Sequence, residues 1–457
     1  MHYKLAIGAA LAASVTSVAA QACDPGTARQ LGGNWYCKLV DSITYNNFES
    51  SGSYDEITGM DNGRCTSQKK AYSGPLAPLD GEISLHFRGP LRLKKVAFYT
   101  MGSSEKREVK PSLHSRRHGH GHLHRKTAEK RAVGDVVTAT IDGKVVQWVN
   151  NYDGSKPAPS PQAAPAGAPA PAPGTDSGAI KGSTPKGDTR KKTPSTNVGA
   201  GQWGRQAMYD AEKGTADGLT FLNHKGGQGS GVFDMYVYPA TPLGFVTLLT
   251  SLYRSLGNSL SFASEDATSG AASPCVLRDT LLSDNQEIVI MSDKECKGND
   301  CGTVRPGTVA YHGFSGASKI FLMEFSMPMS GKKGFNADMP AVWMLNAAIP
   351  RTLQYGKSEC SCWKSGCGEF DVYEVLDSGN TKCKSTLHGN LKGGDSNYFK
   401  RPTDKPVKIA VFFNPLTSSA HIKNLDDSFE FGTSLDSAAV AQFSLEAALS
   451  SVFTLAA

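Results

Sequence analysis

The sequence predicts an all-β protein, in which a sandwich of short strands follows a smaller β-rich unit and a linker. Two observations indicate this fold class. Short apolar or alternating stretches rich in Val, Phe, Trp and Tyr recur between Gly- and Pro-rich turns, and few segments show a helical period. The chain has 457 residues with 48 Gly and 24 Pro, which exceeds one typical domain and indicates linker sequence.

The start of the chain predicts secretion. Lys4 supplies a positive charge, residues 5–18 form a short apolar run, and residues 18–20 form a small-residue cleavage site, so residues 1–20 are expected to be a signal peptide. Ten Cys follow, and an even number in a secreted chain favours disulfides over thiol chemistry. Three of them precede residue 66, so one must stay free or pair across the linker.

Residues 21–102 are predicted to form the first folded unit, with strands at 82–87 and 91–99. Residues 103–201 are predicted to be linker. A basic tract with five His between residues 114 and 124 is read either as metal-binding or, preferably, as a solvated spacer. A hairpin is expected within 133–152, and seven Pro between residues 157 and 173 indicate a stiff, extended spacer.

Residues 202–432 are predicted to form the second folded unit, an all-β sandwich. Two segments remain open. The apolar run 243–256 is compatible with a short helix, an inserted loop or an unspliced intron, and the apolar tail 433–457 is compatible with a lipid-anchor signal. The formal net charge of +6 is accounted for by residues 105–131, so the remaining chain sums to neutrality and no nucleic-acid partner is expected.

The candidate chemistry lies in the motif Glu369-x-Asp371-x-x-Glu374. On a regular strand Glu369 and Asp371 share a face and Glu374 lies on the other. A β-bulge near residues 372–373 would bring all three carboxylates to one face. Side chains leaning together could then approach to about 5 Å, the separation of a retaining glycosidase pair. The competing interpretation is an acidic, solvent-facing edge strand.

The neighbourhood of the motif favours sugar chemistry. Trp343 lies on a predicted strand upstream and could stack on a pyranose ring, or it could be ordinary core. Asn346 ends that strand and is a candidate substrate contact. His388 follows downstream and could polarise a carboxylate or bind a hydroxyl, although a lone His is more often structural. Four Cys near the motif (Cys360, Cys362, Cys367 and Cys383) could suggest zinc, but disulfides that brace the site are favoured.

These residues resemble a known family. Three motifs are similar to glycoside hydrolase family 16 in its laminarinase-type, bulged form: Pro340-Ala341-Val342-Trp343, the acidic motif, and His388-Gly389. The wider layout resembles fungal cell-wall proteins with an N-terminal glycine-rich domain and a C-terminal glycosidase-like domain, over residues 23–100 and about 202–432. Three further segments fit that pattern, namely residues 231–234, 311–316 and 360–363. Residues 241–256 depart from it, because they replace a short turn.

The resemblance implies a β-jelly roll with a sugar cleft on its concave face, and retaining action on β-1,3-glucan. It assigns Glu369 as nucleophile, Glu374 as acid/base and Asp371 as assisting carboxylate. The expected location is extracellular, in the cell wall, and we expect a monomer without a transmembrane span.

Three function hypotheses follow: an endo-β-1,3-glucanase, a glucan transglycosylase at the same site, and a non-catalytic lectin-like wall protein. No cofactor is required by this chemistry, and no metal site is predicted.

Overall fold

The computed structural model describes residue 23 and residues 26–61, 64–102, 136–141, 144–149, 202–226, 259–446 and 448–456. The expected signal peptide, the His-rich tract, the Pro-rich spacer and the segments 231–234 and 243–256 lie outside these residues. The chain divides into two compact units, one formed by residues 1–105 together with 189–457 and the other by residues 106–188. Among the described residues, no helix is long and apolar enough to cross a membrane.

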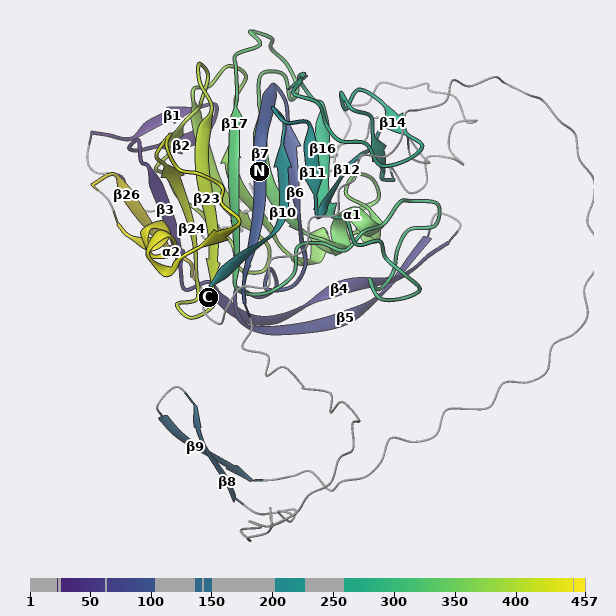
Figure 1. Cartoon of the computed structure of the whole chain (residues 1–457), viewed down its shortest axis with the longest axis vertical. Helices are drawn as coiled ribbons and strands as arrows, with labels where there is room; N and C mark the ends of the chain where they lie inside the picture. Colours follow the sequence, from purple (N-terminus) through teal and green to yellow (C-terminus); the bar gives the residue numbers. More distant parts are fainter. Residues whose placement is uncertain are drawn as a thin grey trace, which may run out of the picture. The chain divides into compact units, whose positions relative to one another are not determined.

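The larger unit contains two ten-stranded sheets (Figure 1). The first sheet has the order β11 (Thr215–Asp217), β10 (Trp203–Asp210), β7 (Leu91–Met101), β17 (Lys319–Ser326), β23 (Val407–Asn414), β24 (Ser419–Leu425), β3 (Ser42–Asn46) and β26 (Ser450–Thr454). Two short strands extend it, since β15 (Leu281–Leu282) pairs with β7 and β25 (Ser434–Leu435) pairs with β10. Its pairings are antiparallel except that between β26 and β3, which is parallel.

The second sheet carries the acidic motif. Its order is β14 (Gly270–Ala271), β13 (Ser261–Ala263), β12 (Leu219–Asn223), β16 (Glu287–Ser292), β6 (Ile83–Arg88), β18 (Ala341–Asn346), β19 (Glu369–Glu374), β20 (Lys382–His388) and β21 (Gly393–Gly394), with β22 (Phe399–Lys400) paired to β20. The main apolar core lies between the sheets, because it combines Phe321 and Val411 of the first sheet with Leu85, Met344 and Phe370 of the second. The all-β sandwich predicted from the sequence is therefore confirmed.

The predicted boundary between two folded units is not a boundary in the structure. Strand β6, from the first predicted unit, lies between β16 and β18, and β7 lies between β10 and β17. The physical reason is that Ile83–Phe87 is buried throughout, as is typical of a strand covered on both faces. An isolated small unit could not cover both faces of this strand. The described residues within 21–102 and 202–432 thus contribute strands to one sandwich.

The apolar tail also belongs to this sandwich. Helix α2 (Ser437–Ser444) begins at Asp436, whose carboxylate accepts a hydrogen bond from the backbone N–H of Ala439 at 2.8 Å. Strand β26 then pairs with β3, so segments near the two ends of the chain are neighbours in the first sheet. The apolar character of residues 433–457 is accounted for by packing, because Val440, Phe443 and Phe453 are buried.

Outside the two sheets, a long hairpin of β4 (Glu49–Asp61) and β5 (Arg64–Pro75) extends past the sandwich (Figure 1). A second small hairpin pairs β1 (Arg29–Leu31) with β2 (Asn34–Tyr36). Three short helical segments precede the acidic strand: α1 (Ala348–Thr352), η1 (Ser358–Cys360) and η2 (Cys362–Ser365). In the smaller unit, β8 (Val136–Ile141) pairs with β9 (Lys144–Val149), which confirms the hairpin predicted there.

Four disulfides link eight of the cysteines: Cys23–Cys37, Cys65–Cys360, Cys296–Cys301 and Cys362–Cys367. Cys65 pairs across the linker, which is one of the two outcomes that the odd N-terminal number of cysteines allowed. Cys360, Cys362 and Cys367 form disulfides as expected, whereas Cys383 is a buried thiol.

Candidate active site

Strand β19 contains the β-bulge that the acidic motif requires. Opposite β18, Asp371 pairs with Trp343 while Tyr373 pairs with Val342, so Val372 is the extra residue. The pairing with β20 shifts over the same stretch. Because of this bulge, Phe370, Val372 and Tyr373 all join the core between the sheets. The three carboxylates therefore share the opposite, outer face of the second sheet, as predicted.

Each carboxylate has a different polar neighbour. The indole N–H of Trp363 donates to Glu369 Oε2 at 2.5 Å. His388 Nε2 lies 3.0 Å from Asp371 Oδ2, and a guanidinium nitrogen of Arg88 lies 3.8 Å from Glu374 Oε1. Two of these groups come from the same sheet: His388 ends β20, which is next to β19, and Arg88 ends β6, which is two strands away. Trp363 comes from η2.

Burial raises the pKa of all three carboxyl groups. For Glu369 the rise is reinforced by the neighbouring charge of Asp371 and opposed by His388 and the Trp363 N–H. For Asp371, burial raises the pKa and the charge of Arg88 opposes the rise. Burial and Asp371 together raise the pKa of Glu374 to about 7. The cluster therefore retains protons at pH values where an exposed carboxyl would be ionised, as a general acid requires.

His388 lies where the sequence predicted a polar contact. It is directly opposite Glu369 in the pairing of β19 with β20, and its imidazole contacts Asp371. Its side chain is 42% exposed. It is therefore accessible from the outer face of the sheet while it also contacts the central carboxylate.

Trp343 and Asn346 lie close to the carboxylates, but both are buried. The Trp343 side chain is only 4% exposed, and its ring stacks on His86 at 5.1 Å with Arg88 5.7 Å from the ring. Asn346 uses its amide in the fold, because it donates to the carbonyls of Pro78 and Cys367 and accepts from the N–H of Ala348. Trp343 is therefore packed beside the carboxylates on the same face of the sheet, and the Asn346 amide is engaged in hydrogen bonds of the fold.

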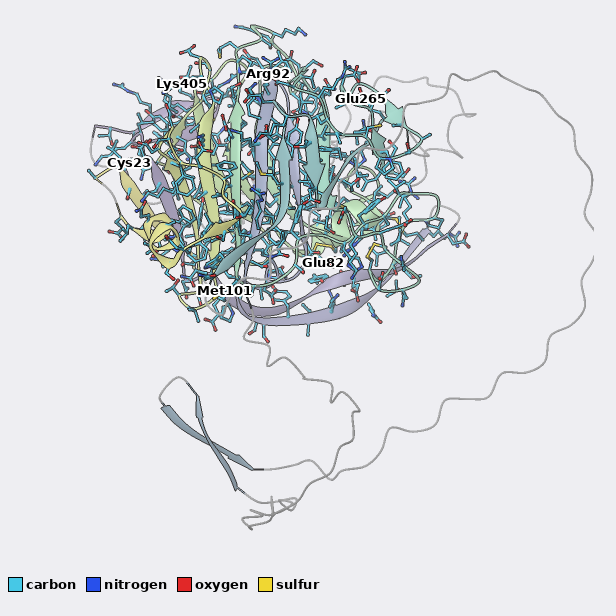
Figure 2. The ribbon with its side chains drawn as sticks, in the orientation of Figure 1. Cys23, Glu82, Arg92, Met101, Glu265 and Lys405 are labelled. Atoms are coloured by element: carbon cyan, nitrogen blue, oxygen red, sulfur yellow. A yellow bond between two sulfur atoms is a disulfide. The ribbon has the colours of Figure 1, made fainter. Side chains whose placement is uncertain are left out.

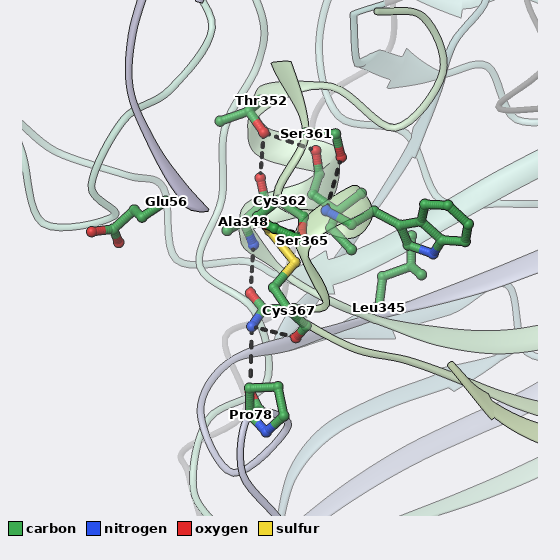
Figure 3. Close-up of a disulfide and its surroundings, with 12 residues drawn as sticks. Glu56, Pro78, Leu345, Ala348, Thr352, Ser361, Cys362, Ser365 and Cys367 are labelled. Atoms are coloured by element: carbon green, nitrogen blue, oxygen red, sulfur yellow. Dashed lines mark hydrogen bonds between the residues drawn. A yellow bond between two sulfur atoms is a disulfide. The ribbon is translucent and has the colours of Figure 1, made fainter. Parts of the chain in front are cut away.

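A disulfide braces the segment that carries Trp363 (Figure 3). Cys362 and Cys367 enclose the short helix η2, and the carbonyl of Cys367 accepts from Asn346 at 3.1 Å. The 3₁₀-helix ends at Gly366, which has φ of 91° and would meet Asn390 if it carried a Cβ. The disulfide predicted near the motif is therefore present, and it closes the loop from which the Trp363 indole N–H reaches Glu369.

A second polar network, which sequence reasoning missed, lies on the same face of the sheet. Glu287 of β16 accepts hydrogen bonds from Tyr355 Oη and, at 2.8 Å, from Gln354 Nε2. His86 Nδ1 lies 3.2 Å from Glu287, and His86 Nε2 lies 2.8 Å from the Ser84 hydroxyl. These residues are far apart in the sequence and share no motif, so only the tertiary structure brings them together.

One group of potential metal ligands occurs among the described residues. Ligand atoms of Cys296, Asp300, Cys301 and His312 lie within 4.8 Å of one another. Cys296 and Cys301 form a disulfide with each other, so neither offers a thiolate. The residues present therefore do not fit a metal centre in this oxidised form.

Comparison with known proteins identifies the family. Residues 201–247 and 249–443 match the family described as "Cell wall protein YJL171C/Tos1, C-terminal", and residues 41–101 match its N-terminal counterpart. A protein of Arthroderma benhamiae named as a probable circularly permuted 1,3-β-glucanase is 45% identical over 94% of each chain. The TOS1 proteins of Candida albicans and Saccharomyces cerevisiae, named in the same way, are 39% and 37% identical, over 89% and 87% of this chain and 90% and 89% of their own.

No solved structure matches this chain. The resemblance to fungal cell-wall proteins, which was expected from the layout of the chain, is confirmed by both family segments and by these relatives. The chain therefore belongs to the YJL171C/Tos1 family of cell wall proteins.

Proposed function

We propose that this protein is a secreted retaining endo-β-1,3-glucanase that acts on glucan in the cell wall. The observation that carries the proposal is the bulged strand β19, which presents Glu369, Asp371 and Glu374 on one face with raised carboxyl pKa values. The names of the relatives support the substrate class. Their description as circularly permuted agrees with the position of the N-terminal strands β6 and β7 inside the two sheets.

In the proposed first step, the Glu369 carboxylate attacks the anomeric carbon of a glucosyl unit. The glycosidic C–O bond breaks, and Glu374 donates its proton to the leaving oxygen. This leaves a covalent glycosyl–enzyme ester and a shortened glucan with a free hydroxyl. In the second step, Glu374 accepts a proton from water as the water oxygen attacks the anomeric carbon, which releases Glu369 and regenerates both groups.

The contacts of the carboxylates support this division of roles. The Trp363 N–H stabilises negative charge on Glu369, which the attacking group and the released carboxylate both need. Glu374 is half-buried at the other end of the motif, and its pKa of about 7 allows it to hold a proton for the leaving group. Burial and the charge of Asp371 raise the pKa of Glu369 to about 8, so the assignment of Glu369 as nucleophile rests on its contact with Trp363 and on the family resemblance and not on the order of the two pKa values. Asp371 lies between them in the motif, and its carboxylate contacts His388. The charge of Asp371 raises the pKa of Glu369, and the charge of His388 opposes that rise.

Two alternatives use the same site. In a transglycosylase, a sugar hydroxyl replaces water in the second step, and the product is longer than the substrate. In a lectin-like wall protein, glucan binds without bond cleavage.

The test is product analysis with the whole chain, because β3, β6 and β7 are part of the sandwich and a fragment beginning at residue 202 would lack them. Laminari-oligosaccharides of defined length are incubated with the wild type and with Glu369→Gln, and products are followed by mass spectrometry. We expect shorter products that disappear in the variant. Longer products would indicate the transglycosylase, and binding with unchanged oligosaccharides would overturn the enzymatic proposal.

The roles of the two glutamates are distinguished by azide rescue. In Glu369→Ala, azide should attack the unoccupied α face and give an α-glycosyl azide from an activated substrate. In Glu374→Ala, azide should resolve the covalent intermediate and give a β-glycosyl azide. The reverse pattern would exchange the two roles.

A further inference from the structure

A cavity of about 450 Å³ lies between the long hairpin and the sandwich, next to the carboxylate cluster but separate from it. The hairpin contributes Tyr54, Glu56, Lys70 and Tyr72 to its lining, and the opposite wall includes Asn346 and Arg351. Its volume is within the range typical of small-ligand sites. The reaction proposed above does not use it.

The hairpin is held firmly enough to form a wall. Its β5 strand is linked to η1 by the disulfide Cys65–Cys360, and Ile57 and Met60 pack with Leu353 in a small apolar cluster. The backbone N–H of Asp55 donates to the Ser365 hydroxyl at 2.8 Å. Covalent, apolar and hydrogen-bond contacts along its length therefore fix its position over the helical segments that precede β19.

The two faces of the hairpin differ in what they contact. Side chains alternate along a strand, so Tyr54, Glu56 and Lys70 share one face, and Tyr72 belongs to it as well. Glu56 and Lys70 form an ion pair at 2.5 Å on this face. On the other face, Asp55 and Lys69 form a similar pair at 2.8 Å but do not line the cavity.

The lining favours a neutral ligand rich in hydroxyl groups. Two of its four carboxylates are paired with cations, Glu56 with Lys70 and Glu82 with Arg351 at 2.5 Å, and a third, Asp300, contacts His312 at 3.1 Å. Asp80 adds a further acid, so the lining disfavours anions and offers many hydrogen-bond acceptors to hydroxyl groups. Figure 2 shows Glu82 on the side of the sandwich that the hairpin passes. The rings of Tyr54 and Tyr72 are stacked at 6.1 Å and add apolar surface. Aromatic faces combined with paired polar groups suit a pyranose ring.

The cavity borders the Glu369 end of the acidic strand. Leu345 pairs with Glu369, and the next residue, Asn346, lines the cavity. Cys362 also lines it and precedes Trp363, which donates to Glu369. A ligand in the cavity is therefore close to the residues that support the nucleophile.

We propose that this cavity is a second carbohydrate site, which binds a neutral β-glucan segment remote from the bond that is cleaved. The identity of the sugar rests on the proposed function, whereas the existence of the site rests on the cavity and its lining. A glucan long enough to occupy both places gains contacts that a short oligosaccharide cannot make. Chain-length preference is then a property of the hairpin.

The test measures binding of laminarihexaose by calorimetry to the full chain in a Glu369→Gln background. Glu56→Gln with Lys70→Met removes the cavity-facing pair, and Tyr72→Ala removes one ring. The matched control is Asp55→Asn with Lys69→Met, on the opposite face of the same hairpin. We expect the dissociation constant to rise about tenfold in the cavity variants, as loss of an aromatic or polar anchor does, and less than about twofold in the control.

The same variants, in the otherwise wild-type chain, separate this proposal from the proposed function. We expect KM for long laminarin to rise while kcat/KM for a short oligosaccharide stays near wild type. Unchanged hexaose binding in both cavity variants, with circular dichroism showing native folding, would overturn the second site even if cleavage is observed. Loss of hexaose binding without any cleavage in the wild type would support the second site and contradict the glucanase. Stronger binding of chitin oligosaccharides than of laminarihexaose would contradict the choice of sugar.

Discussion

Two largely buried carboxyl groups on the outer face of the second sheet, Glu287 and Glu369, have pKa values shifted in opposite directions. Burial opposes the ionised form of Glu287, but donation from His86 and Tyr355 and the charges of nearby imidazoles outweigh it and lower its pKa. For Glu369, burial and the charge of Asp371 raise the pKa, and Trp363 supplies a single strong donor. Burial makes the ionised carboxylate less stable, and neighbouring hydrogen-bond donors and charges determine whether that loss is offset.

In the proposed mechanism, this difference separates a structural carboxylate from a reactive one. Glu287 has its oxygens occupied by Tyr355, Gln354 and His86, so its charge stabilises the fold. The cluster around Glu369 has three acids and few donors, so its protons can be exchanged with a substrate. Turnover, stability and the pH dependence of stability each test whether the two carboxylates differ in this way. A fourth comparison, between two short disulfides, tests whether the support of Glu369 is local.

The largest expected effect is on turnover. We expect Glu369→Gln to lower kcat by about 10³-fold or more, because an amide cannot attack the anomeric carbon. Glu287→Gln should keep kcat within about tenfold of wild type, since Glu287 acts on the fold. Rates of laminarin hydrolysis at saturating substrate measure both, and equal losses in the two variants would remove the distinction.

The effect on stability should be reversed. Glu287→Gln replaces a hydrogen-bonded carboxylate with an amide and should lower the free energy of unfolding by about 3 kcal/mol. Glu369→Gln should leave it unchanged or raise it, because the amide relieves repulsion from Asp371. Denaturant unfolding monitored by Trp fluorescence checks this, with the exposed Glu359→Gln as a control for loss of an acid. A stability loss in Glu369→Gln as large as that in Glu287→Gln would contradict the contrast.

Two disulfides of equal span offer a matched pair. Cys362–Cys367 and Cys296–Cys301 each join residues five positions apart, and removal of either by double Ser substitution should cost about 2 kcal/mol. Loss of Cys362–Cys367 alone should also lower kcat, because that loop holds Trp363 against Glu369. Parallel unfolding and rate measurements distinguish the two effects, and a similar fall in kcat in both variants would show that bracing is not local.

The smallest expected effect is the change in the free energy of unfolding with pH. Raised carboxyl pKa values in the Glu369 cluster mean that the folded state binds more protons than the unfolded state, so wild type should lose stability relative to Glu369→Gln as the pH rises from about 4.5 to 7. Glu287, with its lowered pKa, contributes stability above about pH 4.5 that is lost as the pH falls. Unfolding curves of the wild type, Glu369→Gln and Glu287→Gln at pH 4, 5.5 and 7 should show these opposite trends. The same pH dependence in all three proteins would contradict them.

Local patterns in the sequence predicted a substantial part of the site. The spacing of the acidic motif required a bulge for the carboxylates to share a face, and β19 has it at Val372. The position of His388 one strand away was also predicted and is confirmed by its contact with Asp371. Both depend on neighbouring strands and strand parity, which a short stretch of sequence contains.

Other features could not be predicted in this way. Trp343 was a candidate sugar platform, but burial under His86 and Arg88 leaves no free face, and exposure depends on what packs above a residue. The Glu287 network joins three separate segments, so no local pattern reveals it. The prediction of two separate folded units was wrong for the same reason. Hydrophobic alternation identifies a strand but does not show which strands it pairs with.

The amino-acid sequence by itself determined the all-β class, the single acidic strand with its bulge, and the preference of the cysteines for disulfides, since each depends on residue type and short spacing. Only the tertiary structure decided that the strands on both sides of the linker form one sandwich, which carboxylates are stabilised as ions, and that the β4–β5 hairpin encloses a cavity beside the carboxylates. Those properties depend on burial and on contacts between segments that are distant in the sequence. The free energy of a buried charge depends on the solvent that is excluded and on the polar groups that surround it.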